Sequence, residues 1–175
     1  MPRVKGIKKK DKKVYNEEQS SLLFKSLQMY FLNNKDILDT IHDIVENNDR
    51  RVKLAMIDYF VTIYAKKNKC FIELPEYEYF YINDEYKNQL KSFTKKLFDP
   101  FKRLKKIEFQ YDDVHMITTV GQLNFLKWAL KNNVIQYIED NYEDIYKEMS
   151  KHLEDKKKRQ EAKKQAKLLA SKNKK

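Results

Sequence analysis

Apolar residues recur at intervals of three and four along most of this chain, which is the period of an amphipathic α-helix. The period predicts a first helix that Asn16 caps and that ends near residue 33, and a second helix over 37–46. A third segment, 50–67, is apolar over most of its circumference. We expect it to be the central helix of the fold, with Asp49 as its N-cap.

Two regions favour β-structure instead. Residues 70–74 and 77–82 are rich in β-branched and aromatic side chains on either side of a Pro-Glu pair. Apolar and polar residues alternate over 107–111, and an Asp-Asp pair separates this segment from residues 114–117. Each region is typical of a β-hairpin.

Helical periodicity returns over 84–97 and again after Thr119. Thr119 and Gln122 have the spacing of a capping box, which predicts that a helix begins here and runs to Lys131. A further amphipathic helix is predicted over 135–149, where apolar residues repeat without interruption.

These elements predict a mainly α-helical α+β fold, a single domain with one or two short β-hairpins and flexible basic tails. The 175 residues, 41% of them apolar, suffice for one hydrophobic core but not for two comfortable domains. We assign residues 1–13 to a disordered basic N-terminal tail and residues 14–150 to a globular, mainly helical domain. Residues 151–175 form a basic C-terminal tail, helical or disordered, because the apolar stripe fades there.

Positive charge is concentrated at the two ends of the chain. The net charge is +11, but residues 1–13 carry +6 and residues 151–175 carry +8, which leaves residues 14–150 at −3. Only five of the 37 basic residues are Arg, so the abundance of Lys also reflects a biased composition. The position of the charges is the stronger observation, because basic tails of this kind usually bind polyanions.

A second concentration of positive charge lies inside the body, over residues 87–106, where the net charge is +7. Lys87, Lys91 and Lys95 are four residues apart, so a helix would place them in a row that can neutralise phosphates. The other basic residues of this Lys stripe are Lys96, Lys102, Arg103, Lys105 and Lys106. Two alternatives stay open: a solvated Lys face, or a face that pairs with the acidic segment 36–46.

The sequence shows no catalytic or cofactor motif that we recognise. Its two glycines, Gly6 and Gly121, do not form a phosphate-binding loop, and one Cys with three His cannot form a standard zinc site. One acidic series at helical spacing is interpreted as a solvated helix face rather than a metal site; its members are Asp36, Asp39, His42, Asp43 and Glu46. We therefore predict no catalytic residue, no metal site and no cofactor.

Three further groups have both a structural and a functional interpretation. Cys70 follows lysines that could lower the pKa of its thiol, but a small buried strand residue is the simpler interpretation. Asp112 and Asp113, close to His115, fit a hairpin turn better than a carboxylate cluster. Aromatic residues around the Lys stripe could stack on bases, but their spacing favours the core; they are Tyr77, Tyr79, Phe80, Tyr81, Tyr86, Phe101, Phe109 and Tyr111.

The sequence also bears on location. No stretch approaches the roughly 20 apolar residues of a membrane span, and no apolar signal segment follows Met1. A single cysteine excludes an internal disulfide, which fits a reducing compartment. We expect a soluble protein that is not exported by this route.

Three blocks of the chain carry a resemblance to a known group of proteins. They are residues 52–62 (VKLAMIDYFVT), residues 86–92 (YKNQLKS) with 98–101 (FDPF), and residues 117–125 (ITTVGQLNF) followed by LKWA. Together they resemble a family of small, basic, largely uncharacterised proteins of nucleocytoplasmic large DNA viruses, the giant viruses. The resemblance implies a viral protein in the virion or the host cytoplasm, and it supplies no catalytic residues.

The sequence thus favours a non-enzymatic viral protein that associates with DNA or RNA, as a virion or genome-packaging component. Besides the Lys stripe, the candidate phosphate-binding residues lie in the tails: Lys8, Lys9, Lys10, Lys12, Lys13, Lys156, Lys157, Lys158 and Arg159. The alternative is a scaffold protein of the particle whose acidic body and basic ends join other viral proteins. An enzyme of unrecognised type is the third interpretation. The oligomeric state stays open.

Overall fold

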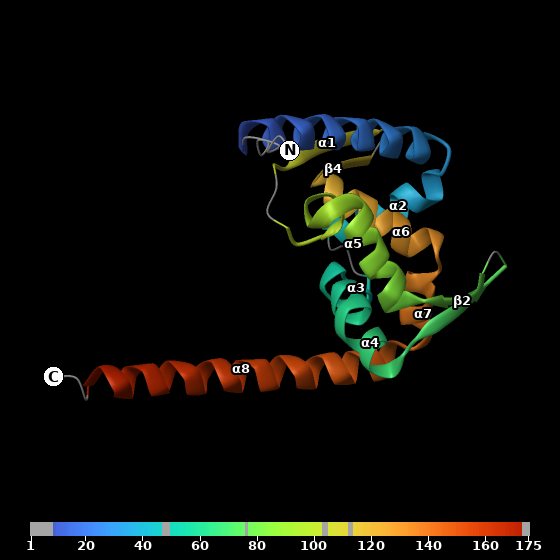
Figure 1. Cartoon of the computed structure of the whole chain (residues 1–175). Coiled ribbons are helices and arrows are strands. Elements are labelled where there is room, and N and C mark those ends of the chain that lie inside the picture. Colours follow the sequence, from blue (N-terminus) through green and yellow to red (C-terminus); the bar gives the residue numbers. More distant parts are fainter. Residues whose placement is uncertain (1–8, 47–49, 76, 103–104, 112–113, 173–175) are drawn as a thin grey trace, which may run out of the picture.

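The computed structural model describes residues 9–46, 50–75, 77–102, 105–111 and 114–172 of the chain. Figure 1 shows a body of packed helices with two hairpins, from which a long C-terminal helix runs away. This arrangement confirms the predicted fold class, a mainly α-helical α+β fold. In chain order the elements are α1 (Lys9–Leu32), α2 (Lys35–Glu46), α3 (Leu54–Tyr59), the π-helical turn η1 (Phe60–Tyr64), α4 (Ala65–Asn68), β1 (Phe71–Leu74), β2 (Tyr77–Tyr81), α5 (Ile82–Phe98), β3 (Ile107–Tyr111), β4 (Val114–Thr118), α6 (Val120–Lys131), α7 (Val134–Asp140) and α8 (Tyr142–Lys172).

The first helix begins earlier than the sequence predicted. α1 starts at Lys9, inside the segment assigned to a disordered tail and ahead of the expected cap Asn16. Lys and Glu favour helix, and Gly6 is the last helix-breaking residue before α1, so the sequence has nothing that stops the helix at Asn16. The other end follows the prediction, because Asn34 donates a hydrogen bond from Nδ2 to the carbonyl of Tyr30 (2.7 Å) in the last turn.

The third helical segment runs over residues 54–68 and consists of α3, η1 and α4. It begins later than predicted, with Lys53 at the N-cap and no side-chain cap bond, and the expected cap Asp49 lies outside the described residues. In η1, the carbonyl of Val61 accepts a hydrogen bond from Nδ2 of Asn83 in α5 (2.7 Å). This contact with a distant residue stabilises a π-helical turn that helical periodicity alone does not reveal.

Both predicted hairpins are present, each as an antiparallel pair of strands. β1 pairs with β2 so that Phe71 lies opposite Tyr81, and β3 pairs with β4 so that Phe109 lies opposite Met116. β4 packs against α2, and its residues are buried alternately. The β1–β2 hairpin projects from the body instead (Figure 1), so that only part of its surface meets other elements.

The predicted capping signal at α6 is confirmed in part. Oγ1 of Thr119 accepts a hydrogen bond from the backbone N–H of Gln122 (3.1 Å), as an N-cap does. The side chain of Gln122 does not complete a capping box with Thr119; its Oε1 accepts from Oγ1 of Thr118 (3.0 Å). The helix therefore begins where the sequence predicts, but with a different second hydrogen bond.

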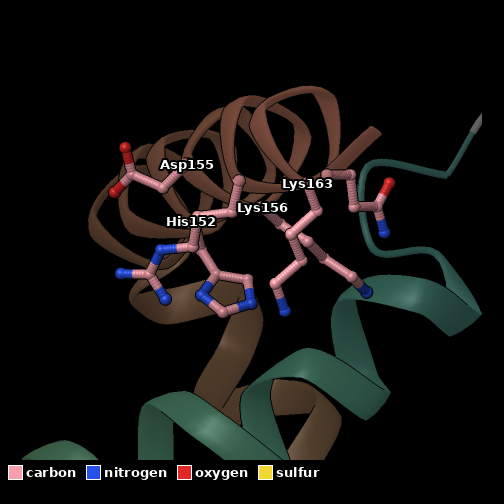
Figure 2. A pocket seen from close by; sticks show the side chains of 6 residues that line it. His152, Asp155, Lys156 and Lys163 are labelled. Carbon is pink, nitrogen blue, oxygen red and sulfur yellow. The ribbon is translucent and has the colours of Figure 1, made fainter. Parts of the chain in front are cut away.

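The predicted helix over 135–149 is two helices in the structure. α7 ends at Asp140, and Asn141 takes a non-helical backbone conformation while its Nδ2 donates to the carbonyl of Tyr137 (2.9 Å). α8 then continues to Lys172, so the described part of the basic C-terminal segment is helical. Figure 2 gives a close view of α8, with helices of the body beneath it.

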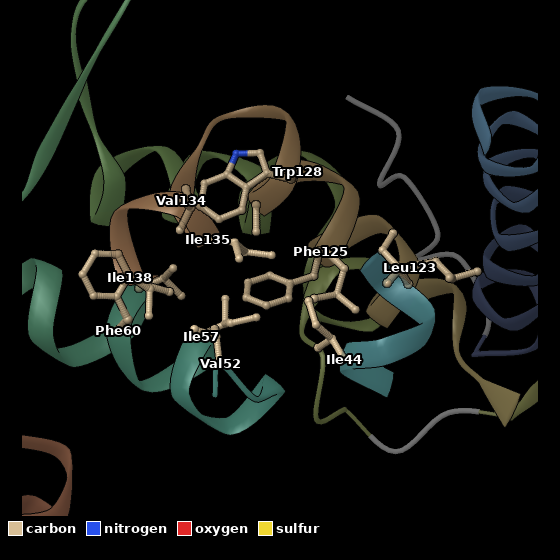
Figure 3. Packing of buried hydrophobic residues seen from close by; sticks show 14 of the residues in the cluster. Ile44, Val52, Ile57, Phe60, Leu123, Phe125, Trp128, Val134, Ile135 and Ile138 are labelled. Carbon is tan, nitrogen blue, oxygen red and sulfur yellow. The ribbon is translucent and has the colours of Figure 1, made fainter. Parts of the chain in front are cut away.

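The hydrophobic core is centred on α6, which contacts α1, α2, α5 and α7. Figure 3 shows Phe125 of α6 amid side chains from several other elements, among them Ile57 and Ile135. Phe125 and Ile57 are fully buried, and Trp128 is nearly so. The central helix is therefore α6, and not the third helical segment as the sequence suggested. That segment still contributes fully buried residues, Ile57, Phe60 and Val61 among them, and it packs against both α5 and α8.

Candidate nucleic-acid interface

The distal half of α8 is the most exposed cationic element of the described structure. Every side chain from residue 153 to residue 166 is exposed to solvent. Within this part of the helix the basic residues are Lys156, Lys157, Lys158, Arg159, Lys163 and Lys164. Because α8 projects from the body there (Figure 1), these side chains are accessible from several directions.

Several of these residues lie on one face of α8. Lys156, Arg159 and Lys163 follow His152 at spacings of four, three and four, which places all four on the same side of the helix. They line a hollow of about 400 Å³ (Figure 2). The ring of His152 lies 5.5 Å from the ring of Tyr59 in α3, centroid to centroid, and this contact fixes the start of the cationic face against the body.

Ion pairs between the body and the helices α7 and α8 neutralise acidic residues near this junction. Arg50 contacts Glu139 (3.0 Å), and Lys67 contacts Glu148 (2.8 Å). Arg51 pairs with Glu143 (2.6 Å), and its guanidinium also lies 4.1 Å from the centre of the Tyr142 ring. Such exposed pairs each contribute about 1 kcal/mol or less. Together they hold α7 and the first turns of α8 against the body, while the distal segment keeps its own acids Glu154, Asp155 and Glu161 among a larger number of cations.

The Lys stripe is exposed, but it is not the straight row that the sequence predicted. The side chains of its described members are solvent-accessible, and Arg103 lies outside the described residues. Thr94 interrupts α5 with φ 64° and ψ 160°, so Lys95 does not continue the helical spacing of Lys87 and Lys91. Lys87 also forms an ion pair with Asp84 of the same helix (2.9 Å) rather than with the acidic segment 36–46.

The N-terminal cluster of candidates is described only in part. Lys8 lies outside the described residues. The backbone of Lys9, Lys10, Lys12 and Lys13 belongs to the first turns of α1. These four residues therefore extend a helix, whereas the sequence placed them in a disordered tail.

The structure exposes aromatic residues that the sequence assigned to the core. Phe80, Tyr86 and Phe109 are buried as expected. Tyr79, Tyr81 and Phe101 are about half exposed, together with Phe71, which the sequence analysis did not single out. Aromatic residues follow one another in β2 and so occupy both faces of the strand, and the sequence does not say which face is covered.

Cys70 is buried just before β1, as the simpler interpretation predicted. Burial raises the pKa of its thiol above the usual value, although a hydrogen bond with the hydroxyl of Tyr137 acts in the opposite direction. At neutral pH the thiol is therefore protonated and a poor nucleophile. The adjacent lysines do not produce a reactive cysteine.

The remaining polar candidates have structural contacts. Nε2 of His115 lies 2.7 Å from Oε1 of Glu108 across the β3–β4 hairpin, while Asp112 and Asp113 lie outside the described residues. Among the residues that the structure describes, no group of three or more His, Cys, Asp or Glu side chains converges as a metal site would require, the acidic face of α2 included.

These features define a class of protein: a helical α+β body that presents a projecting cationic helix. By sequence, the chain belongs to the family of unknown function DUF7197, whose profile matches residues 3–175. It is similar to uncharacterized protein L507 of Acanthamoeba polyphaga mimivirus, with 30% identity over 153 residues, which is 82% of this chain and 58% of that relative. The chain thus spans somewhat less than two thirds of the relative's length.

The mimivirus relative agrees with the giant-virus resemblance of the three sequence blocks. No solved structure matches the chain. Within the described residues, none of the helices combines the length and the apolar character that a bilayer span requires.

Proposed function

We propose that this protein is a non-enzymatic, nucleic-acid-associated protein of a giant virus that binds the phosphate backbone, as a virion or genome-packaging component in the virion or the host cytoplasm. The observation that carries the proposal is the exposed cationic half of α8, which projects from the body as a continuous helix (Figure 1). The exposed lysines of α5 supply a second cationic surface.

The dimensions of α8 suit a duplex. An α-helix with its side chains is about 10–12 Å wide, close to the roughly 12 Å width of the DNA major groove. At about 1.5 Å per residue, the segment from Lys156 to Lys172 is roughly 25 Å long. A duplex carries one negative charge for about every 1.7 Å of its axis, so cations on several sides of such a helix meet phosphates of both strands.

The composition of this surface favours binding to the backbone over sequence readout. Arg159 is the single arginine in the described part of α8 beyond residue 153. Arginine reads guanine through a bidentate contact, whereas lysine acts as a flexible point charge. A helix dominated by lysine therefore supplies affinity without marked sequence preference.

Exposed apolar residues on α1 favour a second function, as a scaffold that docks other viral proteins. Leu22, Met29 and Leu32 are exposed on this helix. Met29 and Leu32 line a mostly apolar hollow together with Phe109 of β3 and the stem of Lys25. A surface of this kind suits a protein partner better than a polyanion.

The affinity of the full-length protein for duplex DNA, measured by fluorescence anisotropy as salt is varied, tests the main proposal. Binding to phosphates predicts that log affinity falls linearly with log salt, with a slope of about −0.9 per phosphate contacted. A parallel series with single-stranded RNA, expected at about −0.7 per phosphate, identifies the preferred polymer. Absence of binding even at about 50 mM salt would contradict the proposal and favour the scaffold.

A further inference from the structure

Three exposed aromatic rings gather on one face of the β1–β2 hairpin. Phe71, Tyr79 and Tyr81 are 42%, 49% and 47% exposed. The ring of Phe71 lies 5.2 Å from that of Tyr79 and 5.9 Å from that of Tyr81, centroid to centroid, and the two tyrosine rings are 6.4 Å apart. We call these three residues the aromatic face.

The rings of the aromatic face do not cover one another. Their planes meet at 87°, 52° and 46°, so each pair is edge-on or tilted and not stacked. Phe80, the neighbour of Tyr79 and Tyr81 in β2, is buried on the opposite side of the strand. The hairpin is therefore held to the body through one side, while the aromatic face leaves ring surfaces open to a ligand.

A cationic hollow adjoins the aromatic face at the base of the hairpin. Tyr81 lines this hollow, which has a volume of about 220 Å³, together with Lys66, Lys69, Lys87 and Asn83. The ammonium of Lys87 contacts Asp84, which also lines the hollow, so Lys66 and Lys69 are the cations better placed to receive an anion. The hollow is smaller than the roughly 300 Å³ of typical small-molecule pockets, which suits one unit of a longer chain.

Asn83, which lines the hollow, has a buried hydrogen-bond acceptor without a partner among the described residues. Asn83 is 8% exposed and donates from Nδ2 to Val61, but its Oδ1 is buried and has no hydrogen-bond partner among the described residues. A buried acceptor without a partner is unfavourable by about 1–3 kcal/mol.

We propose that the aromatic face and the adjoining lysines form a binding site for single-stranded nucleic acid, with bases stacked on Phe71, Tyr79 and Tyr81 and phosphates at Lys66 and Lys69. The inference rests on the proposed nucleic-acid function and names a second site and a strand preference for it. Exposed aromatic rings beside cations are the features with which proteins bind single strands. In a duplex the bases are stacked on each other and closed to side chains, so this site selects unpaired strands.

The charges of the hairpin place the strand at its base. Lys66 and Lys69 flank the start of β1, next to the paired residues Phe71 and Tyr81. The acidic residue Glu73 lies further along β1, nearer the turn. A polyanion is therefore attracted to the base of the hairpin and repelled from its tip.

A comparison of two ligands separates stacking from charge. The full-length protein is titrated with a fluorescein-labelled oligothymidine and with a base-free phosphodiester chain of equal length, followed by anisotropy. Tyr79→Ser is expected to weaken oligothymidine binding about tenfold and to leave binding of the base-free chain unchanged. Tyr146→Ser removes an equally exposed ring (51%) from α8 and should change neither.

The lysines have a matched control. The double substitution Lys66→Gln and Lys69→Gln should weaken the binding of both ligands to a similar extent, because both ligands carry phosphates. Lys53→Gln with Lys147→Gln removes the same charge from exposed positions elsewhere and should have a smaller effect. Circular dichroism and urea unfolding verify that each variant is folded.

The outcomes distinguish this inference from the proposed function. If the wild type binds both ligands equally well, or if Tyr79→Ser has no effect on oligothymidine, the aromatic site is wrong while the phosphate-binding function stands. If the wild type binds neither ligand nor a duplex at low salt, both proposals are wrong. If Tyr79→Ser lowers the affinity for oligothymidine and leaves the affinity for the base-free chain unchanged, the result supports the aromatic site.

Discussion

Asn124 in α6 donates a hydrogen bond from Nδ2 to the backbone carbonyl of Leu97 in the last turn of α5, at 3.0 Å, and both residues are buried. Carbonyls in the last turn of a helix have no partner within the helix, so the side chain of Asn124 caps α5 from a neighbouring element. We expect Asn124→Ala to lower the free energy of unfolding by about 1–3 kcal/mol, because the carbonyl stays buried without a partner.

Urea unfolding measures this effect, and Asn88→Ala is its control. The amide of Asn88 bonds Glu85 at an exposed position of α5 (3.3 Å), so its removal should cost less than about 0.5 kcal/mol. Equal effects of the two substitutions would show that Asn124 is not a cap.

Gly121 is needed where the first turn of α6 meets the end of α5. A Cβ atom at this position would lie 3.1 Å from the carbonyl oxygen of Lys96 and 3.4 Å from that of Asp99. Both are backbone atoms beside the fully buried Phe98, so they cannot move freely. We predict that Gly121→Ala destabilises the protein by about 1 kcal/mol or more in urea unfolding. At an open helix position, Gly→Ala would instead raise the free energy of unfolding by about 1 kcal/mol. A gain in stability from Gly121→Ala would therefore refute the close contact.

Asp58 in α3 gives the stability a pH dependence of unusual sign. Burial, and to a lesser degree the carboxylate of Asp99, raises the pKa of Asp58 above its usual value. The folded state therefore holds this proton more tightly than the unfolded state. The stability that the protonated group contributes is present below the unfolded pKa of about 3.9, and it is lost as pH rises through the folded value.

Asp58→Asn removes this loss, so the variant should be more stable than the wild type at neutral pH, and the difference should shrink as pH falls through the pKa of the folded carboxyl. Urea midpoints at neutral and acidic pH measure the trend. Asp84→Asn, which removes an exposed partner of Lys87, should not raise the stability at neutral pH. A constant difference between Asp58→Asn and the wild type at all pH values would contradict the assignment.

Cys70 should be slow to react in the native protein. Burial raises the pKa of its thiol, and the thiolate is the reactive form. The pKa of its partner Tyr137 is raised to about 12, so that hydroxyl also stays protonated at neutral pH. Modification by a disulfide reagent should be about tenfold or more slower in buffer than in urea. A Cys70→Ser, Tyr146→Cys variant, whose thiol is exposed, should react at similar rates in both; fast native reaction of Cys70 would contradict its burial.

Periodicity predicted most elements of this fold because each carries a local signal. Both hairpins and the start of α6 at Thr119 follow the sequence, since strand composition and cap residues act within a few positions. The features that it missed depend on contacts between distant residues. The π-helical turn η1 receives a hydrogen bond from Asn83, and the spacing of apolar residues along one helix does not reveal a contact with a residue of another helix.

In the candidate site, too, the sequence missed features that depend on contacts between distant residues. Sequence spacing placed Lys87, Lys91 and Lys95 in one row, but the backbone of Thr94 breaks the row where α5 ends against α6. The aromatic residues of β2 were assigned to the core because spacing shows that a strand has two faces without showing which face is covered. The projection of the hairpin, a tertiary feature, decides that Tyr79 and Tyr81 are exposed.

The most direct test of the account compares duplex binding by the wild type with binding by a variant in which Lys156, Lys157, Lys158 and Arg159 are changed to Gln. Glutamine keeps the helix propensity of α8 and removes only charge. The control carries Gln at four exposed lysines outside the proposed nucleic-acid-binding surfaces, Lys25, Lys53, Lys131 and Lys147, so that both variants have the same net charge. We predict that the α8 variant loses most of its affinity and that its salt slope becomes shallower by about 0.9 per lost phosphate contact, while the control retains both. Equal affinities and slopes for the α8 variant and the wild type would contradict the central claim.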